Sequence, residues 1–359
     1  MRGLLKRLAP FAPDSSGVVS ALYEYQGLLV ICDAGGCTGN FCGFDEPRWQ
    51  EKRCALFSAG LRDMDAILGR DDRLVAKALS AARLIKPRFL AIIGTPVPCV
   101  IATDFKGLGR LAEKKLGLPT LTFATTGTGL YDTGLSKAYE RLASHFASQE
   151  LKPQALRVGV LGASPLDLGQ SSARYLQHHL QKAQNTPLEI ITHGLDAGFD
   201  AMRAAASCAK NLVIAPSGLA CAKLLQERFG TPYSLDYPLS PGLEALAREA
   251  ASYARILIIH QQVLASSLRR AIRRAAGSRR PTVCIASFFT MLQELSEDGD
   301  QHLTSEEALI SLIEAGDFDC LVCDAMLLRA IPREQQASMH LLELPHFAVS
   351  GTLMPPGLC

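Results

Sequence analysis

Short apolar runs alternate with segments of helical spacing through the first part of the chain. Leu28–Ile31, Phe89–Ile93 and Thr120–Phe123 are compact apolar runs of the kind found in buried parallel strands. Between them, the segment Arg73–Leu84 repeats its apolar residues at helical spacing (Leu74, Val75, Ala78, Leu79, Ala82). Strands that alternate with helices predict a parallel sheet with right-handed crossovers, so all strand ends of one sense meet at the same edge.

The same alternation continues to the end of the chain. Further strands are predicted at Arg157–Leu161, Leu188–Gly194, Asn211–Ser217, Ile256–His260, Thr282–Phe288, Phe318–Asp324 and His340–Pro345. The pattern predicts an α/β protein of three Rossmann-like domains, each a parallel sheet flanked by helices. We place these domains at residues 1–150, 151–250 and 251–359, with a linker at Leu151–Pro153.

Composition narrows the class of protein. Apolar residues make up 48% and charged residues 20% of the chain, as in globular proteins, and a net charge of +2 argues against a nucleic-acid partner. Neither an apolar run of about 18 residues nor a signal peptide is found, so no membrane association is expected and the cytoplasm is the expected location. One basic cluster (Arg269, Arg270, Arg273, Arg274, Arg279, Arg280) is interpreted as a solvated helix face rather than a docking site for an acidic partner.

Cysteine provides the candidate chemistry. The chain has 11 cysteines, and in a reducing compartment these indicate metal or cluster ligation and buried thiols rather than disulfides. Cys32, Cys37 and Cys42 recur at intervals of five residues in a glycine-rich loop after the first strand. Cys99 lies in the loop after the next apolar run, so Cys37 and Cys99 are expected to approach each other at one sheet edge. Our leading hypothesis is an iron–sulfur cluster held by Cys32, Cys37, Cys42 and Cys99.

Other candidates are weighed against structural roles. Cys320 and Cys323 form a Cys-x-x-Cys, but they lie in an apolar run and are interpreted as opposite faces of a buried strand. The loop Thr125–Gly134 is suited to binding an anion through its backbone N–H groups, although it lacks the lysine of a P-loop. Asp45, Glu46, Arg48 and Trp49 follow the third cysteine and are interpreted as a surface or interface cover over the cluster. His193 and His260 end apolar strands and are weaker site candidates.

Several motifs, taken in order, resemble the nitrogenase component 1 superfamily. These are GVVSALYEYQGLLVICDAGGCTGNFCG at 17–43, LFSAGLRDMDAILGRDDRL at 56–74, the loop GTPVPC at 94–99, RVGVLGASPLD at 157–167 and LQERFGTPYSLDYPLSPG at 225–242. That superfamily includes nitrogenase molybdenum–iron protein subunits, cofactor-assembly scaffolds and light-independent protochlorophyllide reductases. Only Cys37 matches a family cluster ligand directly. Cys32 stands where the family often has a histidine. In the family's corresponding loop the cysteine ligand follows the threonine directly; here Pro96 follows Thr95, and Cys99 lies three residues further on.

The resemblance implies a function and partners. It implies an oxidoreductase subunit that carries a 4Fe-4S or larger cluster, receives electrons from an ATP-dependent iron–sulfur reductase and reduces a small substrate. Three cysteines from one loop leave a cubane one ligand short, so Cys99 or a second subunit in a homodimer or heterodimer is expected to complete the site. Two alternatives stay open: a metallocofactor-assembly scaffold without turnover, and a non-catalytic α/β ligand-binding protein with structural cysteines.

Overall fold

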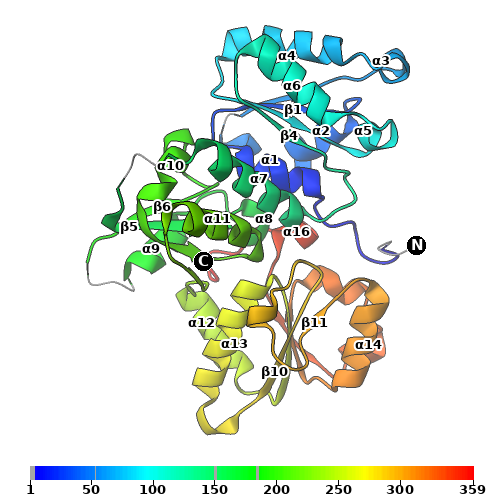
Figure 1. The fold of residues 1–359 in the computed structure, drawn as a ribbon. Coiled ribbons are helices and arrows are strands. Elements are labelled where there is room, and N and C mark those ends of the chain that lie inside the picture. The colour runs from blue at the N-terminus through cyan, green and yellow to red at the C-terminus, as the bar shows by residue number, and fades with distance from the viewer. Residues whose placement is uncertain (1–4, 53, 149–151, 183–185) are drawn as a thin grey trace.

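Three parallel sheets flanked by helices form the molecule, as Figure 1 shows. The computed structural model describes residues 5–52, 54–148, 152–182 and 186–359. The first sheet has the strand order β2-β1-β3-β4, formed by β1 (Leu28–Ile31), β2 (Ala55–Ser58), β3 (Leu90–Ile93) and β4 (Thr120–Phe123). The predicted α/β class with three parallel sheets is confirmed.

The second and third sheets repeat this architecture. The second has the order β6-β5-β7-β8, with β5 (Gln154–Leu161), β6 (Glu189–Thr192), β7 (Cys208–Val213) and β8 (Tyr233–Leu235). The third has the order β11-β10-β9-β12-β13, with β9 (Arg255–Ile259), β10 (Thr282–Ser287), β11 (Gln301–His302), β12 (Cys320–Cys323) and β13 (His340–Glu343). The predicted boundary at residue 150 and the linker residue Leu151 lie outside the described residues.

Helices connect the strands and cover the sheets. Around the first sheet these are α1 (Asp14–Leu22), α2 (Gly36–Asn40), α3 (Asp63–Leu68), α4 (Asp71–Ile85), α5 (Pro96–Val100), α6 (Phe105–Leu116) and α7 (Tyr131–Phe146). The second group is α8 (Pro165–Leu168), α9 (Arg174–Lys182), α10 (Phe199–Arg203) and α11 (Leu219–Phe229). The third is α12 (Pro241–Ala250), α13 (Gln262–Ala276), α14 (Glu306–Gly316), α15 (Arg333–Gln336) and α16 (Phe347–Ser350). Short 3-10 or π turns are η1 (Phe41–Asp45), η2 (Pro47–Gln50), η3 (Ala204–Ser207), η4 (Pro216–Gly218), η5 (Gly277–Arg279), η6 (Gln293–Leu295) and η7 (Ala325–Arg329). No helix within the described ranges is long and apolar enough to cross a bilayer.

Strand alternation divides the core of the first sheet into two layers. Leu29 and Ile31 of β1 join the large core cluster that also contains residues of α1 and α7. Leu28 and Val30 point the other way, into a smaller cluster with residues of α4 and α6. Because successive strand residues face opposite sides, the residue after Ile31 is directed towards the α4 and α6 layer.

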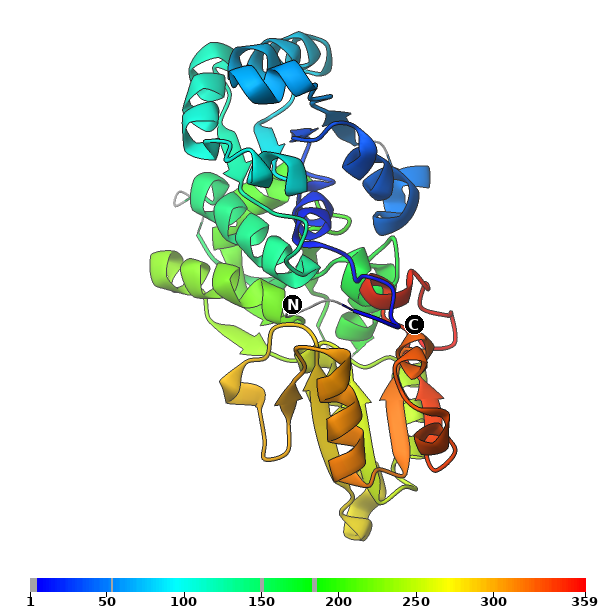
Figure 2. The same cartoon turned by 90° about the vertical axis from the view of Figure 1, so that its right-hand side faces the viewer.

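Both ends of the described chain pack against distant segments. Near the N-terminus, Glu306 Oε1 accepts hydrogen bonds from the backbone N–H groups of Lys6, Arg7 and Leu8 at 3.0, 2.8 and 2.8 Å. Near the C-terminus, the Met354 N–H donates to Gly169 O at 2.9 Å, next to α8. The C-terminal segment therefore leaves the third sheet and contacts the second group of elements, as Figure 2 shows.

Two glycines allow α1 and α7 to touch backbone to backbone. A Cβ atom at Gly17 would overlap the carbonyl oxygen of Tyr131, and one at Gly134 would overlap that of Asp14. Neither carbonyl belongs to a flexible side chain, so the overlap can be relieved only by separating the helices.

We therefore expect Gly134→Ala to lower the free energy of unfolding by about 2–3 kcal/mol or more, because overpacking a rigid contact is destabilising. The matched control is Gly357→Ala, where a Cβ atom would meet nothing within 4 Å. Urea unfolding of the two variants measures the difference. Equal stability of both variants would contradict the helix contact.

Candidate functional site

The glycine-rich loop begins at the carboxyl end of β1, where Asp33 fixes its path. Asp33 is buried, and its Oδ2 accepts hydrogen bonds from the backbone N–H and the hydroxyl of Thr38 at 2.8 and 3.0 Å. Its Oδ1 accepts from Ser58 Oγ at 2.6 Å. One carboxylate therefore ties the start of α2 to the end of β2 and positions the cysteines between them.

Cys32 continues the alternation of β1 and is buried among the apolar residues shared with α4 and α6. Burial raises the pKa of its thiol to about 12, so the thiolate needed for ligation is disfavoured. Thr95 Oγ1 donates to the Cys32 carbonyl oxygen at 2.8 Å and joins the two strand ends. In this conformation the Cys32 side chain belongs to the core layer.

Cys37 and Cys42 have different surroundings. Cys37, in α2, is partly buried; burial and then Asp33 raise its pKa, whereas a hydrogen bond with the Thr95 side chain lowers it. Cys42, in η1, is also partly buried and packs against the large core cluster. Five residues of an α-helix turn about 140° beyond a full turn, so even spacing does not place two thiols on one face.

Burial raises the pKa of the Cys54 thiol to about 12, and a negative charge on nearby Cys42 would raise it further. Cys42 is thus associated with Cys54, whereas Cys37 is associated with Asp33 and Thr95.

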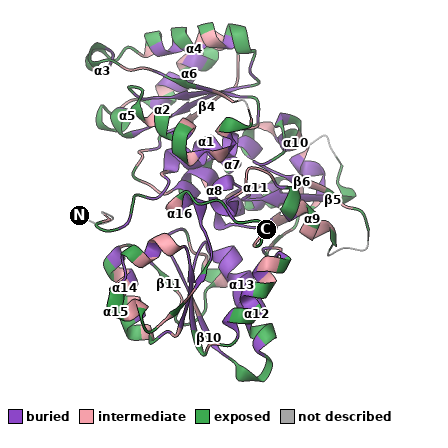
Figure 3. Ribbon diagram, turned by 180° about the vertical axis from the view of Figure 1, so that it is seen from behind, coloured by how far each residue is buried: buried purple, intermediate pink, exposed green. Residues whose placement is uncertain are grey.

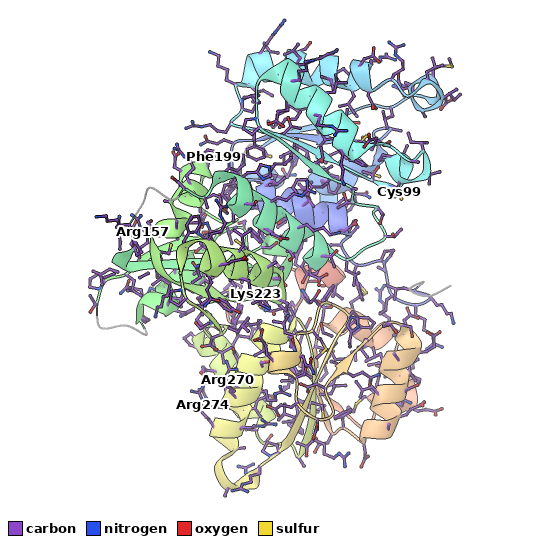
Figure 4. All side chains as sticks on the ribbon, in the orientation of Figure 1. Cys99, Arg157, Phe199, Lys223, Arg270 and Arg274 are labelled. Atoms are coloured by element: carbon purple, nitrogen blue, oxygen red, sulfur yellow. The ribbon has the colours of Figure 1, made fainter. Side chains whose placement is uncertain are left out.

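Cys99 lies in α5, which follows β3, and is exposed. Figure 4 shows Cys99 at the end of the first group of elements where Figure 1 places α2. Among the residues that the structure describes, no three His, Cys, Asp or Glu side chains converge as they would to hold a metal ion. The four thiols Cys32, Cys37, Cys42 and Cys99 are therefore not assembled into a closed ligand set by this chain alone.

Exposed apolar side chains gather at this end of the molecule. They are Phe44, Met64, Ile67, Leu68, Val97, Val100 and Ile101, with Phe44 76% and Val100 84% exposed. They come from η1, α3, α5 and the residue after α5. Figures 1 and 3 show α2 and α5 beside each other and α3 on the same side of the first group, next to α4, with α3 and α5 largely exposed. We call this set the apolar patch. Apolar groups gathered in this way are typical of surfaces that contact another protein.

The loop predicted to bind an anion binds one that belongs to the chain. The N–H groups of Thr126 and Gly127 donate to the Asp14 carboxylate at 3.0 and 2.8 Å. The same carboxylate accepts from the Ser15 N–H at 2.9 Å. These two loop N–H groups therefore serve to hold the start of α1.

The predicted surface or interface cover is wrong for Glu46 and Arg48, which are buried within the chain itself. The Arg48 guanidinium binds Glu46 through two hydrogen bonds of 2.7 Å and Glu24 through one of 3.0 Å. It also donates to Ser20 O at 2.7 Å and to Gly194 O at 2.8 Å. Arg48 thereby connects α1 and the loop after Cys42 to the end of the second sheet.

A second group of buried polar residues lies where the three sheets approach one another. Tyr131 Oη donates to Asp167 Oδ1 at 2.6 Å and lies 2.9 Å from His346 Nε2. The His346 ring stacks on His260 at a centroid distance of 4.1 Å. The sequence indicates only His260, because it ends a strand; Tyr131, Asp167 and His346 carry no signal of their proximity. The cavity beside His260 and His346 has a volume of about 10 Å³, enough for about one water molecule.

The family model of nitrogenase component 1 type oxidoreductases matches residues 16–281, about three quarters of the chain. The chain belongs to this family. The resemblance drawn from the motifs is thus confirmed, and the protein is a nitrogenase-like oxidoreductase or a related scaffold. Family members typically bind metal–sulfur clusters and act in oligomers with a related subunit and a reductase partner.

Solved structures show the same fold at low identity. A structure of nitrogenase Cp1 at pH 6.5 has a TM-score of 0.68 and 12% sequence identity, covering 96% of this chain and 87% of its own. A structure of nitrogenase Cp1 at pH 5 has a TM-score of 0.65 and 13% identity, covering 98% and 86%. No curated protein matches in sequence. At these identities, the likeness establishes the fold alone.

Proposed function

We propose that this chain is a subunit of a nitrogenase-like oxidoreductase that shares an iron–sulfur cluster with a second subunit across the apolar patch. The observation that carries the proposal is the pairing of accessible thiols with an exposed apolar surface. Cys37 is partly exposed and Cys99 is exposed, at the end of the first group where the patch lies. A site open on one side is suited to ligands from a homodimeric or heterodimeric partner.

Residues around Cys37 favour its role as a ligand. The hydrogen bond with the Thr95 side chain lowers the pKa of the Cys37 thiol and so opposes the effects of burial and Asp33. Asp33 fixes the start of α2 through Thr38, which limits the motion of the thiol. A bound cluster would supply a one-electron carrier. Electrons would come from an ATP-dependent iron–sulfur reductase and pass to a small substrate.

Of the other two cysteines in the loop, Cys32 must change its side-chain position to bind a cluster, whereas Cys42 need not. Cys42 is partly exposed and needs only a partner ligand nearby. Cys32 needs its side chain to leave the α4 and α6 layer before it can bind a cluster at this surface.

We expect Cys37→Ala to lose most of the iron and acid-labile sulfide that the wild-type protein holds after anaerobic expression and reconstitution, because it removes the most favourable ligand. Cys284→Ala is the matched control, since Cys284 is also partly buried but lies in β10 of the third sheet. Iron and sulfide counts per chain provide the measurement. Full iron retention in Cys37→Ala would overturn the assignment, and a wild-type protein without iron would favour a ligand-binding protein with structural cysteines.

One observation favours a cofactor-assembly scaffold as the second candidate. The cavity of about 10 Å³ where the sheets meet has room for a water molecule but not for a substrate. Turnover of a substrate there would require the three groups of elements to separate. Reduction of the iron-loaded protein by an ATP-dependent reductase, with and without product formation, separates the enzyme from the scaffold.

A further inference from the structure

An open groove lies on the third group of elements, away from the cysteine loop. Its volume is about 520 Å³, and it is lined by Arg7, Leu328, Arg329, Ile331, Pro332, Arg333 and Gln336. These residues come from the N-terminal arm, from η7, from the connection after η7 and from α15. Volumes of this size are typical of sites for small organic ligands. We call it the arginine groove.

The three arginines of the groove lack carboxylate partners. Neither Arg7, Arg329 nor Arg333 forms an ion pair within the described part of the chain, and all three are exposed. Arg7 Nη1 donates to the Ala330 carbonyl oxygen at 3.2 Å, which holds the arm against the end of η7. The groove lining contains no acidic residue, so its charge is uncompensated by its own walls.

The arginines of α13 show the opposite arrangement. Arg269 is buried, contrary to the predicted solvated face, and binds Asp300 at 2.7 Å. Arg270, Arg273 and Arg274 pair with Asp236, Glu297 and Glu244, respectively. Figure 4 shows Arg270 and Arg274 along this helix. These four arginines of α13 are thus neutralised by their neighbours, whereas those of the groove are available to a ligand.

The remaining lining residues define what such a ligand would look like. Leu328, Ile331 and Pro332 give the groove an apolar part that suits a carbon skeleton. Gln336 Nε2 donates to Leu328 O at 2.9 Å and to Ile331 O at 2.8 Å, so the backbone that forms this part is held in place. Guanidinium groups bind carboxylate and phosphate oxygens in bidentate geometry.

We propose that the arginine groove is a binding site for a small organic anion that bears at least two phosphate or carboxylate charges. The site is separate from the proposed cluster surface and does not depend on cluster binding. It therefore gives the chain a second ligand, of metabolite size, on the third group of elements.

The test measures binding of pyrophosphate and of citrate to the full-length protein by isothermal titration calorimetry at low ionic strength. We expect saturable binding of at least one probe, and the stronger of the two identifies phosphate or carboxylate as the preferred group. Arg329→Gln with Arg333→Gln should weaken it about tenfold or more, because two charge-assisted contacts are lost. Arg333→Lys should weaken it less, since the charge stays and only the bidentate geometry is lost.

Arg279→Gln with Arg280→Gln is the matched control. Arg279 and Arg280 are likewise exposed and form no ion pair within the described residues. They follow the C-terminal end of α13 and line no part of the groove. This double variant removes the same charge and should change the affinity less than twofold. Absence of saturable binding of both probes, or equal weakening in the control, would overturn the proposal.

Discussion

Arg48→Ala is expected to lower the free energy of unfolding by about 3–5 kcal/mol, because truncation leaves a buried carboxylate without its partner. The Arg48 side chain is 0% exposed and that of its bidentate partner Glu46 is 2% exposed. The substitution also removes the bond to Gly194 O and the contact of the guanidinium with the Tyr23 ring, at 4.6 Å from its centroid. Urea unfolding under reducing conditions measures the loss.

Lys52→Ala is the control, because it removes a partly exposed cation in place of a buried one. Lys52 also bridges to the second group, pairing with Glu24 and Asp196 at 2.9 and 2.6 Å, but its side chain is 29% exposed. Exposed pairs contribute about 1 kcal/mol or less, so this variant should stay close to the wild type. Combining Arg48→Met with Glu46→Leu should be less destabilising than Arg48→Met alone, since no charge is then left buried. An Arg48→Ala variant as stable as Lys52→Ala would contradict the role of this ion pair.

The buried strands were open to prediction because their residues are apolar throughout. β1, β3 and β12 are buried at every position, and a continuous apolar run is the pattern of a strand covered on both faces. In β12 the Cys-x-x-Cys residues face opposite layers, with Cys320 in one core cluster and Cys323 in another, as the strand period predicts.

Two edge strands, β2 and β8, carried too weak a pattern to be predicted. Of the four residues of β2, only Leu56 is buried, and β8 has three residues of which none is fully buried. Their backbone pairing with β1 and β7 makes them strands, and that depends on neighbours distant in sequence. The local sequence pattern therefore does not reveal these two short, half-exposed edge strands.

The candidate site was predictable in place but not in its ligand set. Strand order and right-handed crossovers bring the loops after β1 and β3 to one edge, so Cys37 and Cys99 fall at the same end of the first sheet. The side-chain directions depend on details that spacing does not encode. The alternation of β1 places the Cys32 side chain in the core layer with Leu28 and Val30. The rotation along α2 and η1 gives Cys37 and Cys42 different neighbours. The same limit hid Arg48, whose partners lie up to 146 positions away in sequence.

Acidification from pH 6.5 towards pH 4 is expected to destabilise the protein steeply, because three buried histidines are held neutral. Burial lowers the pKa of His193 to about 4 and the pKa values of His260 and His346 to about 3. An unfolded histidine titrates at about 6.5, so below that pH the unfolded state binds protons that the folded state rejects. Each such group contributes up to about 1.4 kcal/mol of lost stability per pH unit.

Asp167 acts in the opposite direction. Burial raises its pKa to about 6, so the folded state takes up a proton that the unfolded state binds only near pH 3.9. Among these four groups, this uptake between pH 6 and pH 4 offsets one histidine and leaves the effect of the other two. Stability should therefore still fall with pH, and it should be nearly constant above about pH 7.5 as far as these groups are concerned.

His193→Leu isolates one contribution to this acid sensitivity. Neither ring nitrogen of His193 has a hydrogen-bond partner in the described structure, so the substitution removes a titration without breaking a hydrogen bond. Its urea midpoint should depend less on pH between 6.5 and 4.5, the slope in free energy falling by about 1.4 kcal/mol per pH unit. His178→Gln, at an exposed position of α9, should leave the slope unchanged. A His193→Leu protein with the wild-type slope would show that His193 is protonated in the folded state, and burial would then not be the cause of the acid sensitivity.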